Sequence, residues 1–468
     1  MMFRRHCGWG WPLSWPGAEG RLARLLPLVS LTCLTLFAAG RLACAADAPS
    51  LPTYTLEDCV GVALAQQQEV LAAVQQVREA EGKVRQTRSL SGPHANLDTS
   101  WTQYDWLPPS KERILGGGTT DVYSEVVLRQ ILYSGGRIQG LLSQAELDLL
   151  SAHERLRRVR QTVAFGVSQA FYRLLEARAL LQVQDEAVRQ VQAQLEIARK
   201  RYEVGAARQL DVLKAEVQLA NVQQAQVAAK NRVDLGRMSL NLAMGRAPET
   251  PLAVAAPETP APGAGTERPA AEVIPSHPEW VQSELGLRRA QAGLRVARAL
   301  GLPQVDLRAA YNLEGGTFPP DIENWNVGVG VSLPLWDSGD RRGAMQQASA
   351  RLEQSRVLQD ALRQRLELDI KEAQVAIRDA QERMHVTALS VEQARQALVV
   401  EQERYRVGTG SSAEVIDAQV ALAQAGANAV RAEYDLRVAL AQLAHAQGHD
   451  PAVAEQTRGA GAISGGAQ

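Results

Sequence analysis

The chain has 468 residues, of which 46% are hydrophobic and 22% are charged, and a formal net charge of −1. This length can bury a sizeable core, and the near-neutral charge excludes the basic surface that a nucleic-acid-binding protein needs. The histidines have no HExxH-type spacing, and we find no phosphate-binding loop or nucleophile elbow. The sequence therefore predicts no enzyme, no metal site and no cofactor.

Residues 1–45 have the pattern of a secretory signal peptide. Arginines precede an apolar run from Leu25 to Ala39, and Ala43-Cys44-Ala45 supplies the small residues of a cleavage site. The run of about 15 residues is shorter than the roughly 20 that a transmembrane anchor needs. Cys44 could instead carry a lipid, although Arg41 stands where such signals have leucine.

Removal of residues 1–45 takes away five Arg and one Glu, so the formal net charge falls from −1 to −5. Of the four cysteines, only Cys59 then remains. An exported chain with one thiol has no internal disulfide, so we expect packing and oligomerisation to stabilise it.

The first part of the chain predicts a helix and a β-hairpin. Helical periodicity extends from Thr55 to Leu90 and stops before Pro93. Two strands with period-two alternation follow, from Leu97 to Trp106 and from Asp121 to Gln130, and residues 107–118 between them predict a loop.

The stretch from Gly136 to Gly205 predicts one uninterrupted helix, since it contains no proline. Apolar residues recur in it every seven positions, which is the seam of a coiled coil. The seam residues are Leu174, Leu181, Val188, Leu195 and Tyr202. About 65 helical residues span roughly 100 Å, so this helix must pack against other long helices.

The long helix occurs twice. Adding 203 to each seam position gives Ile377, Met384, Val391, Leu398 and Tyr405, and the same offset relates Gly245 and Pro248 to Gly448 and Pro451. The second half also predicts a helix from His277 to Leu300 and strands from Val305 to Leu313 and Glu323 to Leu335. We therefore expect a first repeat over 46–248, a proline-rich linker over 249–272, a second repeat over 273–452 and a disordered tail over 453–468.

The four strands have the pattern of a membrane barrel. In the last one, Val327, Val329 and Val331 alternate with glycine and small polar residues, as lipid-facing and lumen-facing positions do. Four of the five tryptophans after residue 45 lie at or near these strands, as in an interfacial girdle. Four strands cannot close a barrel, and an open edge in lipid leaves backbone groups unpaired. The sequence thus predicts several chains per barrel.

From residue 54 to residue 452 the chain resembles the TolC-type outer-membrane efflux proteins. The resemblance rests on the duplication, on Tyr133-Ser134-Gly135-Gly136-Arg137, on Arg201-Tyr202-Glu203-Val204-Gly205 with its copy from Arg404, and on Met244-Gly245-Arg246-Ala247-Pro248. It implies a mainly α fold with a β-barrel segment, in which a homotrimer forms a twelve-stranded barrel in outer-membrane lipid above a periplasmic helical tunnel. The implied partners are a periplasmic adaptor protein and an inner-membrane pump, of the RND type or an ABC exporter.

Two groups of site residues follow from the resemblance. The helical turns would dock the adaptor through small residues that admit another helical hairpin closely. The predicted docking residues as a whole are Arg201, Tyr202, Val204, Gly205 and Ala206 in the first half, and Arg404, Tyr405, Val407, Gly408 and Thr409 in the second. Gly205 and Gly408 also permit the chain reversal directly, because glycine tolerates a positive φ at the end of a helix.

Glu414 and Asp417, with Asp211 in the first half, match positions where family members narrow the pore with acidic rings. Being three residues apart, Glu414 and Asp417 share a helix face, and in a trimer each would form a ring of three carboxylates. We expect such rings to favour cations, to bind divalent ions and to contain carboxyls with raised pKa values. Gly410 stands where the family has an arginine that bridges to the acid matching Asp211, so the closed pore must be held differently.

One other class of protein fits part of the sequence. An exported coiled-coil scaffold or adhesin without a conduction pathway would explain the signal peptide and the long helices. It would not explain the four lipid-patterned strands, and conductance in planar bilayers distinguishes the two classes.

Overall fold

A computed structural model describes residues 53–255 and 268–449 of the chain. The predicted signal peptide with Cys44, the middle of the predicted linker and the predicted tail lie outside the described residues. Within the described ranges, no helix carries an apolar stretch of the length that would cross a bilayer.

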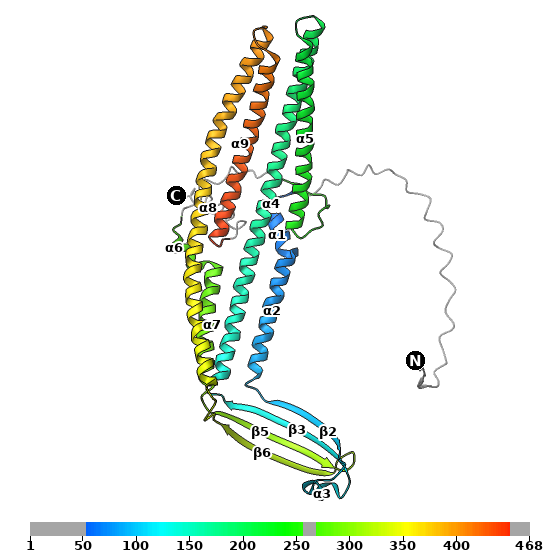
Figure 1. Ribbon diagram of the computed structural model, residues 1–468, viewed down its shortest axis with the longest axis vertical. Coiled ribbons are helices and arrows are strands. Elements are labelled where there is room, and N and C mark those ends of the chain that lie inside the picture. The colour runs from blue at the N-terminus through cyan, green and yellow to red at the C-terminus, as the bar shows by residue number, and fades with distance from the viewer. Residues whose placement is uncertain (1–52, 256–267, 450–468) are drawn as a thin grey trace, which may run out of the picture. The chain divides into compact units, whose positions relative to one another are not determined.

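Two pairs of long helices dominate the fold (Figure 1). Helix α4 spans Arg137–Glu203 and α8 spans Asp340–Arg406, each with 67 residues. Their return partners, α5 (Gln209–Ala243) and α9 (Ser412–Ala446), have 35 residues each. All four pairs of boundaries differ by the predicted offset of 203, so the predicted long helix and its copy are confirmed.

Shorter helices lie beside the long ones. Helix α7 spans Pro278–Ala299, close to the predicted range. The single helix predicted from Thr55 to Leu90 is wrong, since the structure has α1 (Leu56–Gln66) and α2 (Gln68–Ser89) with Gln67 in an extended conformation between them. The turn at Gly245 lies against this break, where a Cβ atom would come within 3.0 Å of the Gln66 carbonyl oxygen. The helix is therefore interrupted by tertiary packing and not by a helix-breaking residue.

A four-stranded antiparallel sheet lies at one end of the helices, with the strand order β2-β3-β5-β6. The strands are β2 (His94–Gln103), β3 (Thr120–Tyr133), β5 (Gln304–Gly315) and β6 (Ile322–Ser332). Both predicted hairpins are present, with boundaries shifted by a few residues. Every residue of the two edge strands, β2 and β6, is solvent-exposed in the single chain.

The loop predicted over residues 107–118 is not irregular throughout. It contains helix α3 (Pro109–Leu115), which has proline at its first position and ends at Gly116 in the left-handed conformation. Lys111 of this helix forms ion pairs with Asp121 (3.1 Å) and with Glu314. The sequence did not reveal this tie between the loop and strands β3 and β5.

The predicted linker is also partly structured. Strand β1 (Thr53–Tyr54) pairs in parallel with β4 (Ala253–Val254), and helix α6 (Ala270–Val273) leads through a short 3-10 helix (Ile274–Ser276) into α7. These segments fix the chain beside the middle of the long helices.

The core lies between the helices rather than in a globular centre. Phe171 and Leu174 of α4 pack with Leu240 of α5 and with Met244, the residue just after α5. All four side chains are fully buried. Each such side chain stabilises the fold by about 2 kcal/mol. The predicted seam is buried at Val188, Leu195, Ile377 and Leu398, but Tyr202 and Met384 are exposed.

Candidate functional site

The two helical turns farthest from the sheet have the same backbone design. At the first tip (residues 204–208), Gly205 has φ +74° and its N–H donates to the carbonyl of Tyr202, while Ala206 N–H donates to the carbonyl of Arg201. This is a Schellman motif, which requires a left-handed residue that glycine provides without strain. Val204, at the apex, is exposed.

The second tip (residues 407–411) repeats the motif. Gly408 has φ +83°, its N–H donates to the carbonyl of Tyr405, and Thr409 N–H donates to the carbonyl of Arg404. Val407 is again exposed at the apex. The structure therefore places the predicted turn residues of both repeats at two matching tips.

The acidic residues after each tip cap the returning helix. Glu414 accepts a hydrogen bond from the backbone N–H of Ser411 (2.8 Å), and Ser411 Oγ accepts one from Glu414 N–H (3.3 Å). Asp211 accepts in the same way from Arg208 N–H (3.2 Å). The Ser-x-x-Glu pattern of residues 411–414 is the sequence signature of this capping box.

This cap changes what is expected of Glu414. The N–H of Ser411 stabilises the carboxylate, so in the single chain the pKa of Glu414 lies below its usual range. The sequence predicted raised pKa values for the acidic rings. For Glu414, the hydrogen bond from Ser411 within the single chain lowers the pKa instead of raising it.

Arg201 joins the two tips. Its Nη1 donates to the carbonyl of Tyr405 and its Nη2 to the carbonyl of Arg406, both at 2.6 Å. Its guanidinium also lies 4.5 Å from the centroid of the Tyr405 ring. A cation is favoured both at the carbonyl end of a helix and over an aromatic face, so the end of α8 is a suitable partner.

The duplicated residues do not repeat this contact. Arg404, the copy of Arg201, pairs with Glu401 of its own helix at 2.9 Å. Accordingly Tyr405 is only 6% exposed, whereas its counterpart Tyr202 is 47% exposed. The two tips have nearly the same sequence and backbone but different surroundings.

An apolar groove of about 440 Å³ lies between the first turns of α5 and α9. Leu210, Leu213 and Val217 form one wall, and Ile416 and Asp417 contribute to the other. The three α5 residues are exposed, although they follow helical spacing. Sequence reasoning missed this groove, but apolar residues at positions three and four apart just after a predicted turn were its signal.

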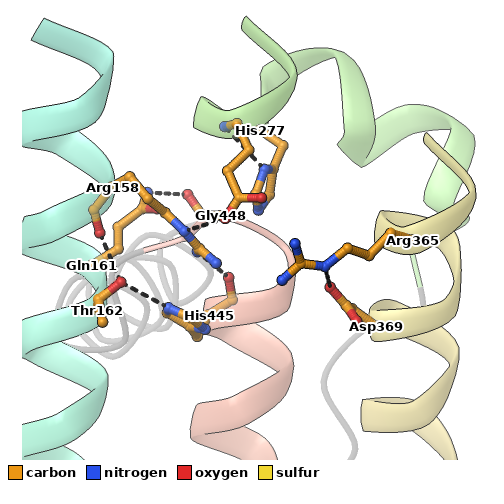
Figure 2. A network of polar contacts seen from close by, with 9 residues as sticks. Arg158, Gln161, Thr162, His277, Arg365, Asp369, His445 and Gly448 are labelled. Carbon is orange, nitrogen blue, oxygen red and sulfur yellow. Dashed lines mark hydrogen bonds and ion pairs between the residues drawn. The ribbon is translucent and has the colours of Figure 1, made fainter. Parts of the chain in front are cut away.

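A polar network holds the end of α9 against α4, far from the tips (Figure 2). Arg158 of α4 donates to the His445 carbonyl at 3.3 Å and pairs with Glu279 of α7 at 2.8 Å. The side chain of Gln161 donates to the carbonyl of Gly448. The ring of His445 is stacked on Phe165, with the two ring centroids 4.9 Å apart.

Two histidines in this network are uncharged. Burial, together with the charge of the nearby Arg158, lowers the pKa of His277 to about 4. Burial likewise lowers the pKa of His445 to about 4, again helped by Arg158. His277 Nδ1 caps α7 by accepting from the N–H of Glu279 (3.3 Å). Within the described residues, no group of three or more His, Cys, Asp or Glu side chains is placed to hold a metal ion.

Comparison with known proteins is consistent with this architecture. Residues 60–246 and 271–449 match the family model described as "Outer membrane efflux protein". The chain is similar to outer membrane efflux protein BepC of Brucella suis, with 24% identity over 328 residues that cover 69% of this chain and 71% of BepC. It is 22% identical over 320 residues to alkaline protease secretion protein AprF of Pseudomonas aeruginosa, covering 66% of this chain and 64% of AprF.

The fold is also similar to that of a solved structure. The outer membrane protein VceC of Vibrio cholerae superimposes with a TM-score of 0.74 at 19% identity, over 84% of this chain and 96% of VceC. Because the likeness covers 84% of this chain, the fold described above is similar to that of a known outer-membrane protein.

Proposed function

This chain belongs to the outer membrane efflux protein family and is an outer-membrane channel for efflux or secretion, and we propose that it works as a homotrimer with a shared twelve-stranded barrel. Like its family, it extends into the periplasm and acts with an adaptor protein and an inner-membrane pump. Family membership disfavours the alternative of a scaffold or adhesin without a conduction pathway.

The observation that carries the shared barrel is the open sheet, and the number of three copies comes from the resemblance to the family. Strands β2 and β6 are its edges, and neither edge is paired in the single chain. In a bilayer each unpaired backbone group costs several kcal/mol, so the edges must find partners. Pairing β2 of one copy with β6 of the next closes the sheet, and three copies give twelve strands, within the range of outer-membrane barrels.

The exposed side chains of β6 support the same conclusion. Val327, Val329 and Val331 are each more than 60% exposed, and all lie on one face of the strand. A continuous apolar face of this kind is unfavourable in water and suits contact with lipid. Mass measured in mild detergent should correspond to three chains, and a stable membrane-inserted monomer would refute the proposed architecture.

The tips are the proposed adaptor-docking surface. Val204 and Val407 at the apices and the groove formed by Leu210, Leu213 and Val217 expose apolar side chains at the end of the helices opposite the sheet. In an outer-membrane protein this end faces the inner membrane. The adaptor's helical hairpins would bury these side chains, whether the pump is of the RND type or an ABC exporter.

Arg201 is proposed to hold the pore closed. The family arginine is absent at Gly410, but Arg201 makes an equivalent kind of link by joining the α4–α5 hairpin to the carbonyl end of α8. Glu414 and Asp417 would line the constriction below it, with Asp417 at the edge where the groove between α5 and α9 meets the pore. Asp417 makes no ion pair among the described residues, so its charge is available to a permeating cation.

A further inference from the structure

A pocket of about 620 Å³ lies where strand β6 leads into helix α8 and where helix α7 ends. Three arginines, Arg298, Arg341 and Arg342, contribute to its wall together with the side chains of Leu335 and Trp336. No part of the mechanism proposed above uses this pocket. Its combination of guanidinium groups and exposed apolar side chains indicates a ligand with both an anionic and an apolar part.

The charges in the pocket are unbalanced. Asp337 is held by Arg341, whose Nε donates to its carboxylate at 2.6 Å, and by the N–H of Gly339 at 3.1 Å. Arg298 and Arg342 are exposed and have no ion pair within the described part of the chain. The pocket therefore presents more positive charge than its single aspartate neutralises.

The ordinary role of arginines at helix ends explains only one of the three. Arg298 is in the last turn of α7, where a cation stabilises the helix dipole. Arg341 and Arg342 are in the first turn of α8, where a cation is unfavourable. Arg341 is compensated by Asp337, whereas Arg342 has no ion pair within the described part of the chain and is free to bind an anion.

The backbone is shaped to admit Arg341. A Cβ atom on Gly301 would lie 3.0 Å from Arg341 Nη1 and 3.3 Å from its Cδ. Glycine at the end of α7 thus lets this side chain lie across the helix end and into the pocket. With Asp337 fixing its other side, Arg341 has a defined orientation, which favours directional contact with a phosphate group.

The apolar wall lies at the depth of a membrane interface. Trp336 is 86% exposed and follows the lipid-patterned strand that contains Trp325. The two tryptophans are 11 positions apart in the sequence, which spans at most roughly 37 Å, or about 26 Å at a tilt of 45°, close to the height of the apolar band of a barrel. Trp325 and Trp336 would then mark the two interfaces, with the pocket at the periplasmic one.

We propose that this pocket binds the phosphate group of an anionic phospholipid in the periplasmic leaflet of the outer membrane. Arg298 and Arg342 contact the phosphate, Arg341 is held in place beside them, and Trp336 and Leu335 lie against the glycerol and upper acyl chains. The inference rests on the proposed membrane barrel, because only that barrel places the pocket at a leaflet.

The test uses the full assembly purified in mild detergent and stripped of lipid. Native mass spectrometry counts the phosphatidylglycerol or phosphatidylcholine molecules bound during a titration. The variant is Arg298→Gln with Arg342→Gln. The matched control is Arg88→Gln, because Arg88 occupies the same place in α2 as Arg298 does in α7 but is paired with Glu146 (3.7 Å).

The parent should prefer phosphatidylglycerol to phosphatidylcholine, and the double variant should bind phosphatidylglycerol about tenfold or more weakly, since each basic residue near a lipid surface contributes on the order of 1 kcal/mol. Arg88→Gln should bind like the parent, and Trp336→Ala should bind both lipids more weakly. Millimolar inorganic phosphate should not displace the lipid, because it lacks the apolar part.

Equal binding of the two lipids by the parent, an unchanged preference in the double variant, or displacement by inorganic phosphate alone would overturn the proposal. Loss of chains from the assembly of the double variant, with no lipid bound by the parent, would show that a neighbouring chain covers the pocket. Conductance of the same preparation distinguishes failure of the lipid site from failure of the proposed channel function. A parent protein that conducts but shows no lipid preference refutes the lipid site alone. A parent protein that neither inserts into the bilayer nor conducts refutes the proposed function.

Discussion

Arg201 extends from the first tip to the second, where its guanidinium lies 4.5 Å from the ring centroid of Tyr405 and donates to that residue's carbonyl. This contact joins the two helical hairpins at their tips. It is the point at which a small change in sequence should have a large effect on the channel.

We first predict that Arg201→Ala opens the isolated trimer more often. The two hydrogen bonds from a charged donor contribute about 1–3 kcal/mol to the closed arrangement, so opening should become about tenfold more frequent. Single-channel recording in planar bilayers measures this directly. Arg404→Ala is the control, because Arg404 forms an ion pair with Glu401 of its own helix and makes no side-chain hydrogen bond to the first tip among the described residues. Equal open times for the two variants would contradict the role of Arg201.

The second prediction concerns the groove at the tips. Leu213→Glu combined with Val217→Glu should leave the trimer and its insertion intact but abolish efflux or secretion, because charges would replace the apolar wall that meets the adaptor. Val227→Glu is the control, being exposed on the same helix about 15 Å farther along. Chemical cross-linking to the adaptor is the second readout. Normal cross-linking by the double variant would place docking elsewhere.

These substitutions avoid the turn glycines for a structural reason. Gly205 and Gly408 have φ values of +74° and +83°, which side chains adopt only with strain. A tryptophan at either position would disturb the turn as well as the surface. A loss of transport in such a variant could not be assigned to docking alone.

The third prediction concerns charge in the pore. Glu414→Gln with Asp417→Asn removes the proposed rings while glutamine keeps the hydrogen bond to Ser411. Conductance of the parent should be cation-selective and reduced by millimolar divalent ions. In the double variant the reversal potential in a salt gradient should move toward zero and the divalent block should weaken. An unchanged reversal potential would mean that both residues lie on a solvated outer face and not in the pore.

The fourth prediction is a loss of stability in acid. His277 and His445 have pKa values of about 4 in the fold and 6.5 as free side chains. Both are neutral in either state above pH 6.5, so they have no effect there. Between pH 6.5 and pH 4 the unfolded chain binds protons that the folded chain does not, so stability falls, by up to about 3 kcal/mol for each histidine.

His277→Asn tests this prediction, because asparagine also caps helices and does not titrate. The midpoint of thermal unfolding should fall less steeply between pH 6.5 and pH 4 in this variant than in the parent. His385→Asn, at an exposed position of α8, should leave the slope unchanged. If the parent showed no decline over this range, the two histidines would not be held neutral by the fold.

The regular parts of the fold could be predicted because their signals are local. Gly205 and Gly408 end the long helices by backbone conformation, and the absence of proline together with the apolar heptad marks each helix as continuous in the sequence. The offset of 203 residues then transferred each boundary from one repeat to the other. The same reasoning located both hairpins.

The features that escaped prediction depend on contacts between distant segments. The break in the helix at Gln67 is caused by contact with the turn at Gly245, and no residue type near the break indicates it in the sequence. Tyr202 and Tyr405 stand in nearly identical local sequences, yet only Tyr405 is covered, because the side chain that covers it comes from the other repeat. Local pattern cannot distinguish such copies.

The equal lengths of α4 and α8, and of α5 and α9, have a consequence for assembly. Three chains would bring six tips to one level, arranged with approximate sixfold symmetry. Because Arg201 covers the tyrosine of every second tip only, the six positions would alternate between two kinds. A partner ring of six identical subunits would therefore contact two kinds of binding site in alternation, and each subunit would have to be able to bind both kinds.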